Sequence, residues 1–287
     1  LYFIDASTEV IKEIKELLKR FQSVASASYS NRTGSQRDVA KAQAEVSLSL
    51  ERLYGLEQQR ESAMAVINAL LDRDPMQKVG KATLPSQPVL KHSLIELVNL
   101  AVIHRQEIKE AEALAARSTY AKRLARLAYI PDLGVGFEYN QVKMEDQDDN
   151  WMVPIRFNVP IWQNRIIPEI QEAKQMENAR KAQLIQAKNL TFAEVKDSYY
   201  HYQAAMKIAD LYEAAVIPQA QIALNADLAG YEASKNDFLN LLDSERIYFN
   251  AKLSQIQFYT EGLKAYANLV RATGLDLEST LKEGVKQ

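Results

Sequence analysis

The residue types that most often carry catalysis or hold metal ions are sparse in this sequence. It contains no cysteine, which excludes disulfides, thiolate metal sites and cysteine nucleophiles. The histidines are His92, His104 and His201. His104 and Glu107 have the i, i+3 spacing of a helical metal-ligand pair, but the second pair that such a site needs does not occur. An exposed helical histidine therefore explains His104 better than a metal ligand does.

Other motifs with known chemistry are also missing from the sequence. The six methionines are dispersed, which disfavours a soft-metal site. Gly134 and Gly136 do not begin a phosphate-binding loop, because no later glycine and no following helix fit the pattern. Neither a nucleophile elbow nor a zinc-protease motif occurs. The net charge of -2 gives no reason to expect nucleic acid. The sequence predicts no catalytic site, no metal site and no cofactor.

Apolar residues recur with helical spacing through most of the chain. There are only nine glycines in 287 residues, and no apolar run reaches the roughly 18 residues of a transmembrane helix. The stretch 167–229 would measure roughly 95 Å as one helix, with a kink expected at Pro218. This length indicates coiled-coil pairs or a wall of helices. The expected segments are a helical hairpin at 1–72, a connector at 73–91, a helix at 92–128, a strand pair at 129–165, a long helix at 166–230, a turn and helix at 231–274 and a tail at 275–287.

The two helical hairpins resemble each other as an internal repeat. Tyr29 matches Tyr231 at an offset of 202 residues, and the pair Val39-Ala40 falls on Leu241-Leu242. Each copy has a helix, a polar turn after the tyrosine, and a second long helix. The opening residues are helical in pattern without a cap, which indicates a chain that begins inside a helix. A complete protein is then expected to hold a further helix and a second strand pair.

The strand pair has one apolar and one polar face on each strand. In YIPDLGVGFEYN and WMVPIRFNVPIW, apolar residues alternate with polar or small ones, and the acidic loop 141–150 between them must be solvated. Glu138 and Arg156 lie on the polar face, where lining a wet lumen is favoured over catalysis. The residues expected to face lipid are Leu133, Val135, Phe137, Tyr139, Val153, Ile155, Phe157 and Val159.

Aromatic residues lie at both ends of this pair. A hairpin brings Tyr139 near Trp151 at the loop end and Tyr129 near Trp162 at the other end. The two levels are separated by roughly 33 Å along a strand, or about 23 Å vertically with the tilt of a membrane barrel. This approximates the apolar band between the aromatic girdles of outer-membrane barrels. Two strands alone would leave unsatisfied backbone groups in lipid, so other strands must complete a barrel.

These segments resemble the TolC-like outer-membrane efflux proteins over essentially the whole chain. The most specific pieces are YIPDLGVGFEYN, VPIRFNVPIWQN and the second turn with its return helix, which starts GYEASKNDFLNLLDSERIYFNAK. The resemblance implies a mainly α fold of long antiparallel helices with barrel strands, a TolC-like α/β-barrel that is trimeric when complete. It implies an exit duct in the outer membrane of a Gram-negative bacterium, with a long periplasmic extension. The duct would passively export drugs or metal ions, and the implied partners are outer-membrane lipid, a periplasmic adaptor and an inner-membrane pump of RND or ABC type.

The resemblance also implies roles for residues in the two turns. Asp243 occupies one position of the family's aspartate ring, Asn240 replaces the other aspartate, and Asp237 lies three residues earlier. Carboxylates ringed around a narrow pore attract cations and resist anions; the alternative for Asp243 is a solvated residue near a helix start. The usual turn glycine is replaced by Arg32 in the first repeat and by Ser234 in the second. The candidate adaptor contacts are Tyr29, Arg32, Gly34, Tyr231 and Ser234.

Two other classes of function compete with the passive duct. A periplasmic adaptor also carries a helical hairpin, but adaptors have glycine-rich β-modules, whereas this chain repeats its hairpin and has little glycine. A soluble coiled-coil scaffold would bury its strands instead. That alternative predicts that Phe137, Ile155 and Phe157 pack onto the chain's own helices.

Overall fold

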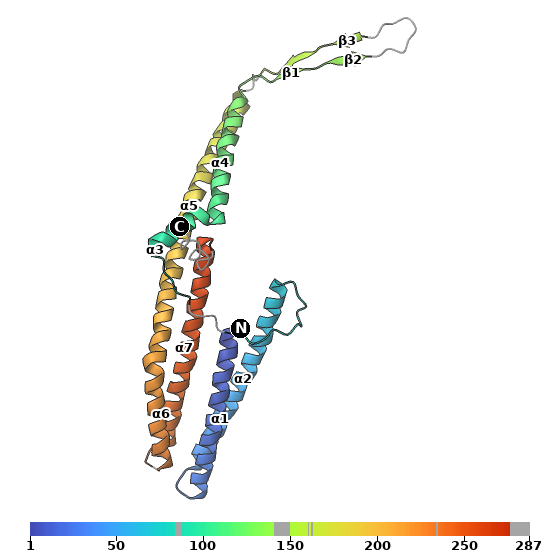
Figure 1. The fold of residues 1–287 in the computed structure, drawn as a ribbon. Coiled ribbons are helices and arrows are strands. Elements are labelled where there is room, and N and C mark those ends of the chain that lie inside the picture. The colour runs from blue at the N-terminus through green and yellow to red at the C-terminus, as the bar shows by residue number, and fades with distance from the viewer. Residues whose placement is uncertain (84–87, 141–149, 160, 162, 234, 276–287) are drawn as a thin grey trace, which may run out of the picture. The chain divides into compact units, whose positions relative to one another are not determined.

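A computed structural model describes residues 1–83, 88–140, 150–159, 161, 163–233 and 235–275 of the chain (Figure 1). The helices are α1 (Tyr2–Ser30), α2 (Gln36–Leu70), α3 (Leu94–His104), α4 (Gln106–Leu127), α5 (Gln163–Leu211), α6 (Ile217–Glu232) and α7 (Phe238–Thr273). The strands are β1 (Leu133–Val135), β2 (Glu138–Asn140), β3 (Asn150–Met152) and β4 (Ile155–Phe157). The chain divides into two compact units. The tip unit comprises 1–92 and 196–269, and the ribbon unit comprises 93–195 with the described residues from 270 onward.

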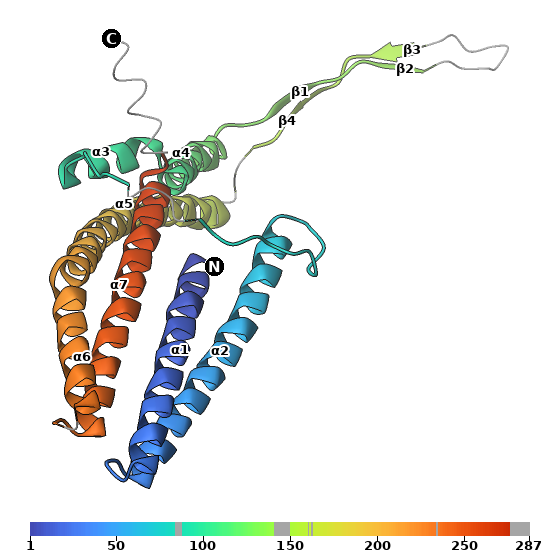
Figure 2. The ribbon, with the colours of Figure 1, turned by 60° about the horizontal axis from the view of Figure 1, so that its bottom comes forward.

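The tip unit contains two helical hairpins that pack through one apolar core. Figure 2 shows α1 and α2 lying beside α6 and α7. The core draws on all four helices, with Ile14, Leu18, Phe21, Ala42, Leu224, Tyr231, Phe238, Leu241 and Phe249 among its buried residues. Ion pairs between Glu13 and Lys252 and between Glu45 and Arg246 lie beside this core. On α1 the core buries Ile14, Leu18 and Phe21, which share one face of the helix.

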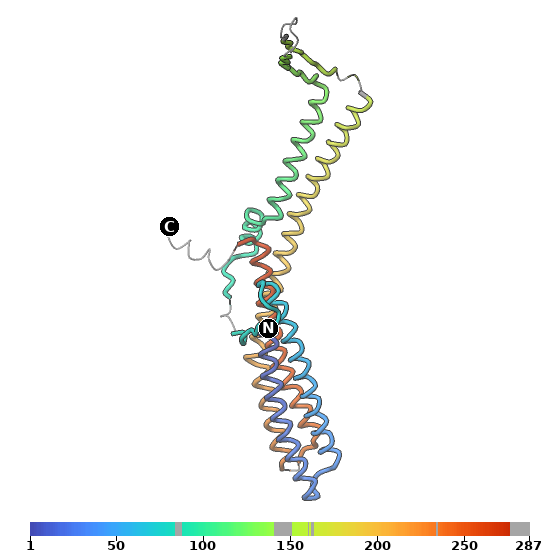
Figure 3. Tube along the Cα trace, turned by 90° about the vertical axis from the view of Figure 1, so that its right-hand side faces the viewer, coloured from blue at the N-terminus to red at the C-terminus, as the bar shows by residue number. Residues whose placement is uncertain are grey.

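The ribbon unit places α4 and α5 side by side, with the strands following α4 (Figure 3). Glu177 on α5 is almost fully buried and accepts a hydrogen bond from Thr119, at 3.2 Å. Its carboxylate also pairs with Lys122, and with Lys181 at 2.9 Å. The two lysines, Lys122 first, lower the pKa of Glu177 to about 2. A shared ionic cluster thus joins the two helices.

The helix expected at 92–128 is wrong as a single element, because the structure divides it at Arg105. Ser93 caps α3 in a capping box with Glu96, but Arg105 has extended backbone angles (φ -65, ψ 126). Its guanidinium is nearly buried and pairs with Glu194, Nη1 to Oε2 at 2.6 Å. Gly274, with φ +70, ends α7 against His104 and Arg105, where an added Cβ would lie 3.1–3.2 Å from their backbone atoms. The helix therefore breaks at Arg105 because of contacts with Glu194 and Gly274, which are distant in sequence. The residues next to Arg105 include no glycine or proline that would end a helix.

The long helix expected at 166–230 begins at Gln163, as α5, and contains Pro168 within its first turns. Residues Tyr212–Val216 form a π-helical segment directly before α6, which has a proline in its first turn. Because Pro218 cannot donate a backbone hydrogen bond, a shift in the bonding pattern is expected there. The expected kink at Pro218 thus falls directly after a π-helical segment, in the first turn of α6.

Candidate functional site

The strands form the antiparallel hairpin that the sequence predicts. β1 pairs with β4 and β2 pairs with β3, in separate two-stranded sheets. Leu133 faces Phe157, Val135 faces Ile155 and Tyr139 faces Trp151. Tyr139 and Trp151 therefore lie side by side at the loop end, as expected. The opposite level is only partly described: Tyr129 is 46% exposed, while Trp162 and the loop residues 141–149 lie outside the described residues.

The apolar face of the ribbon is uncovered in the described part of the chain. The side chains expected to face lipid are Leu133, Val135, Phe137, Tyr139, Val153, Ile155, Phe157 and Val159, and they are 48–73% exposed. On this face the rings of Phe137 and Trp151 stack with centroids 6.4 Å apart. Within the ribbon unit the prediction of the soluble-scaffold alternative is wrong, because Phe137, Ile155 and Phe157 are 66–70% exposed and do not pack onto α4 or α5.

The polar face carries a cross-strand ion pair. Arg156 Nη2 lies 3.4 Å from Glu138 Oε1, and both side chains are exposed. Opposite charges on neighbouring strands stabilise a sheet modestly. The two polar residues singled out from the sequence are thus brought together on one face of the ribbon.

The two turns of the tip unit have the same backbone geometry at the repeat offset. In the first, the amides of Thr33 and Gly34 donate to Ser28 O, at 2.9 and 3.0 Å. In the second, the amides of Lys235 and Asn236 donate to Gly230 O, at 2.8 and 3.2 Å. These residues are separated by the 202 positions that relate Tyr29 to Tyr231. The repeat inferred from the sequence therefore describes a repeated backbone turn.

The candidate adaptor contacts occupy different environments in the two turns. Arg32 has φ 58, so the position expected for a glycine does adopt the left-handed conformation that favours one. Tyr29 is 49% exposed, whereas Tyr231 is 8% exposed and packs its ring against Phe238 at 5.2 Å. Ser234 lies outside the described residues.

The candidate gate residues fall into two neighbouring sites between the hairpins. Asn240 and Asp243 line a groove of about 450 Å³ together with Lys41, Glu45 and Arg246. Asp243 is exposed there and makes no ion pair with any described residue. A second hollow, of about 280 Å³, is lined by Asp237 among others.

Asp237 differs from Asp243 in having a described cation within ion-pair distance. Its carboxylate lies 3.9 Å from Arg37 Nη2, a long and exposed pairing. The structure therefore groups Asn240 with Asp243 and separates Asp237 from them.

Sequence reasoning missed three carboxylates near the turns, of which the fold buries two and half-buries the third, Asp227. Asp38 is 6% exposed and Glu245 is 4% exposed. Asp227 accepts hydrogen bonds from Ser244 and from Asn236, the latter at 3.0 Å. Of these three, only Asp38 could have been singled out from the sequence, because the repeat offset of 202 residues relates it to the candidate gate residue Asn240.

The metal-ligand pair considered at His104 and Glu107 is wrong as a helical pair. His104 ends α3, while Glu107 belongs to α4 and pairs with Arg105 at 3.3 Å. Across the described residues, no three histidine, aspartate or glutamate side chains gather as a metal ion would need.

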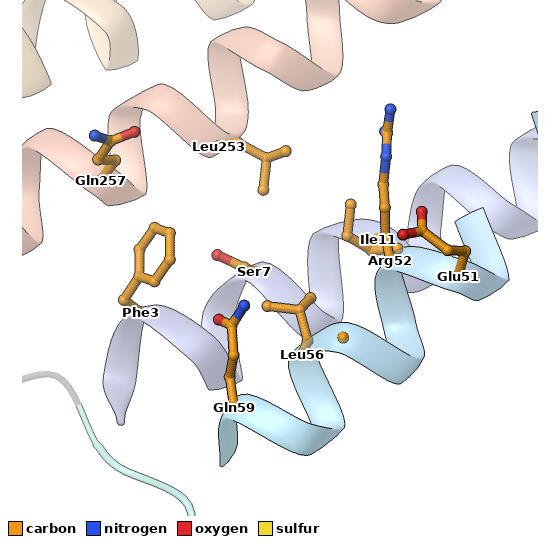
Figure 4. Close-up of a pocket in the computed structure, with 10 residues that line it drawn as sticks. Phe3, Ser7, Ile11, Glu51, Arg52, Leu56, Gln59, Leu253 and Gln257 are labelled. Carbon is orange, nitrogen blue, oxygen red and sulfur yellow. The ribbon is translucent and has the colours of Figure 1, made fainter. Parts of the chain in front are cut away.

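A further groove, of about 420 Å³, lies between α1, α2 and α7 (Figure 4). Phe3, Leu56 and Leu253 give it apolar walls, and the buried Ser7 hydroxyl has no hydrogen-bond partner among the described residues. Glu51 is the one carboxylate in its lining. Its described lining therefore lacks the paired acids that glycoside hydrolysis uses.

The chain has the fold of outer-membrane channels. It matches VceC from Vibrio cholerae with a TM-score of 0.84 at 17% identity, covering 95% of this chain and 66% of that one. For the channel OprN the TM-score is 0.86 at 19% identity, covering 96% and 65%. For CmeC from Campylobacter jejuni it is 0.81 at 14% identity, covering 99% and 64%. The chain thus spans slightly less than two thirds of the length of each of these channels.

The family is established by sequence as well as by fold. The model of the outer membrane efflux protein family matches residues 97–275, more than half of the chain. The chain belongs to this TolC-like family of outer-membrane channel proteins. This membership overturns the alternative of a periplasmic adaptor. A comparison with curated protein sequences finds no match. None of the helices in the described segments is both long and apolar enough to cross a membrane.

Proposed function

We propose that the complete protein is the outer-membrane exit duct of an efflux system, which passively releases small molecules such as drugs or metal ions. The observation that carries the proposal is the ribbon, whose apolar face and ion-paired polar face are both uncovered by the described helices. An apolar face of this size exposed to water would favour aggregation. Contact with lipid on that side and water on the other satisfies both faces.

A ribbon of two strands cannot fill this role alone. Its outer edges hold backbone groups that find no partners in hydrocarbon, so strands from elsewhere must close the sheet. We assign those strands to a second pair in the complete chain and to two further copies, which gives a homotrimer with a 12-stranded barrel. The family membership and the repeated hairpin of the tip unit support this assembly.

The gate and the partner contacts are assigned to the turns of the tip unit. Asp243 and Asn240 would line the narrow periplasmic end, and three copies of Asp243 would attract cations. Arg37 partly neutralises Asp237, so Asp237 contributes less to this field. Tyr29, Arg32 and Gly34 in the first turn, and Tyr231 with Ser234 in the second, would meet a periplasmic adaptor that joins the duct to an RND or ABC pump.

The test is single-channel recording of the full-length protein in a planar lipid bilayer. The account predicts discrete conductance steps from detergent-extracted trimers. A matched variant, Val135→Arg, puts a charge on the lipid side and should abolish insertion, at a cost of about 2–4 kcal/mol near the bilayer centre. Trimers that insert into the bilayer without conducting would contradict the proposal.

A further inference from the structure

Glu245 is a buried acid between the two hairpins of the tip unit. It is 4% exposed on α7, one turn after Leu241 and one turn before Phe249, both of which belong to the apolar core. No described residue donates a hydrogen bond to its carboxyl group. Asp243 and Asn240, the candidate gate residues, lie within five positions on the same helix.

The charged groups around Glu245 do not neutralise it. On α2, Glu45 is 14% exposed and is paired with Arg246 of α7, and Arg52 is a second cation. Burial, and after it the charge of Glu45, raises the pKa of Glu245 to about 7, against the opposing effect of Arg246 and Arg52.

The other two helices bring carboxylates that already have partners. Glu13 of α1 pairs with Lys252, and Asp227 of α6 accepts from Ser244 and Asn236. Lys12 and Arg20 of α1 line a groove with Phe249, one turn from Glu245, but the charges that act on the pKa of Glu245 are those of Glu45, Arg246 and Arg52.

The two protonation states of Glu245 place different demands on the packing. The neutral acid suits this largely apolar site, while a carboxylate there has no hydrogen-bond donor among the described side chains and repels Glu45. Ionisation can be accommodated by letting water between α2 and α7, or by drawing Arg246 away from Glu45. Both responses weaken the contact between the hairpins directly behind Asn240 and Asp243.

We infer that Glu245 is a regulatory protonation site, at which proton binding holds α2 against α7 and proton loss loosens the hairpins behind the candidate gate. The effect on a gate rests on the proposed function. The pH-dependent packing does not, because it follows from the buried acid and its neighbours alone. The ligand of this site is therefore the proton, and the pH around the helical turns sets how much of the protein has Glu245 protonated.

The first test is hydrogen exchange of α7 in the full-length protein, corrected for the intrinsic effect of pH. A folded pKa above the ordinary value of 4.5 means that closed packing is favoured at low pH and weakens as pH rises through about 7. With these two values, local opening should increase roughly thirtyfold between pH 5.5 and 8.5. Glu245→Gln, which is neutral at every pH, should flatten this dependence, and the exposed control Glu57→Gln should retain it. A change below threefold in the unsubstituted protein would overturn the inference.

The second test separates this inference from the proposed function. In bilayer recordings, the open fraction of the unsubstituted channel should rise between pH 5.5 and 8.5, and that of Glu245→Gln should not. Conductance with the same pH response in both proteins would overturn the role at the gate. If the protein does not conduct but its hydrogen exchange still depends on pH, the proposed duct function is contradicted. The inference that Glu245 is a protonation site would still hold in that case.

Discussion

Each turn of the tip unit requires one glycine. It is the second residue of the contacting pair in the first turn (Ser28 and Gly34) and the first residue of the equivalent pair in the second turn (Gly230 and Asn236). In the first turn, a Cβ added to Gly34 would lie 2.8 Å from Ser28 Cβ and 3.2 Å from two backbone atoms. In the second, a Cβ added to Gly230 would lie 2.4 Å from Asn236 Nδ2. Gly230 occupies the repeat position of Ser28, and Asn236 that of Gly34. We therefore predict that Gly34→Ala disrupts its turn and that adding Ser28→Gly restores it.

The magnitude follows from what the new Cβ meets. The most severe contact at Gly34 is with Ser28 Cβ, whose position is fixed by the backbone, so the clash cannot be relieved by a rotamer change, and overpacking of this kind costs about 1–3 kcal/mol. This corresponds to roughly 5- to 150-fold faster opening of the turn. Ser28→Gly alone should cost a few tenths of a kcal/mol through helix propensity.

The assay is residue-resolved hydrogen exchange of the Thr33 and Gly34 amides, both of which donate to Ser28 O. The double variant should exchange within a few-fold of Ser28→Gly, which makes the two substitutions strongly non-additive. Additive effects, or a Gly34→Ala protein that exchanges like the unsubstituted one, would refute the steric reasoning.

Three further changes test the core, the ionic cluster and the gate. Phe238→Ala should destabilise the tip unit by about 3–5 kcal/mol, because the ring is fully buried, and Phe238→Leu by less, as measured by denaturant-dependent exchange in α7. The pairing of Glu177 with Lys122 and Lys181 stabilises the fold above pH 4.5 and is lost as pH falls toward 2, since its pKa is lowered to about 2. The difference in Tm between the unsubstituted protein and Glu177→Gln should shrink over that range, and a constant difference would exclude the linkage. Asp243→Asn should reduce cation selectivity, and an unchanged reversal potential in a salt gradient would remove Asp243 from the gate.

Local patterns carried the parts of the fold that are set by neighbouring residues. Alternation and the position of the acidic loop predicted the strand register that pairs Tyr139 with Trp151. The tyrosine near the end of each helix predicted two equivalent turns, and the helix expected from residue 92 does begin there, after the capping residue Ser93. In each case the side-chain period or the cap lies within a few residues of the feature that it specifies.

Features set by distant contacts could not be predicted in this way. The break at Arg105 depends on Glu194 and on the close approach of Gly274, neither of which is near in sequence. The burial of Glu245 depends on which face of α7 meets α2. A glutamate near a helix start otherwise has the pattern of a solvated residue, so its surroundings became visible only with the packed hairpins.

The central claim is that one face of the strand ribbon contacts lipid and the other contacts water. These 287 residues contain no cysteine, so single cysteines that carry spin labels can be introduced at Val135 and Ile155 on the apolar face, and at Glu138 and Arg156 on the polar face, with any cysteine elsewhere in the full-length protein replaced by serine. In reconstituted liposomes, the account predicts that the first two labels are relaxed by oxygen and the last two by a water-soluble nickel chelate. Labels at Val135 and Ile155 that respond to the nickel chelate as strongly as those at Glu138 and Arg156 would contradict it.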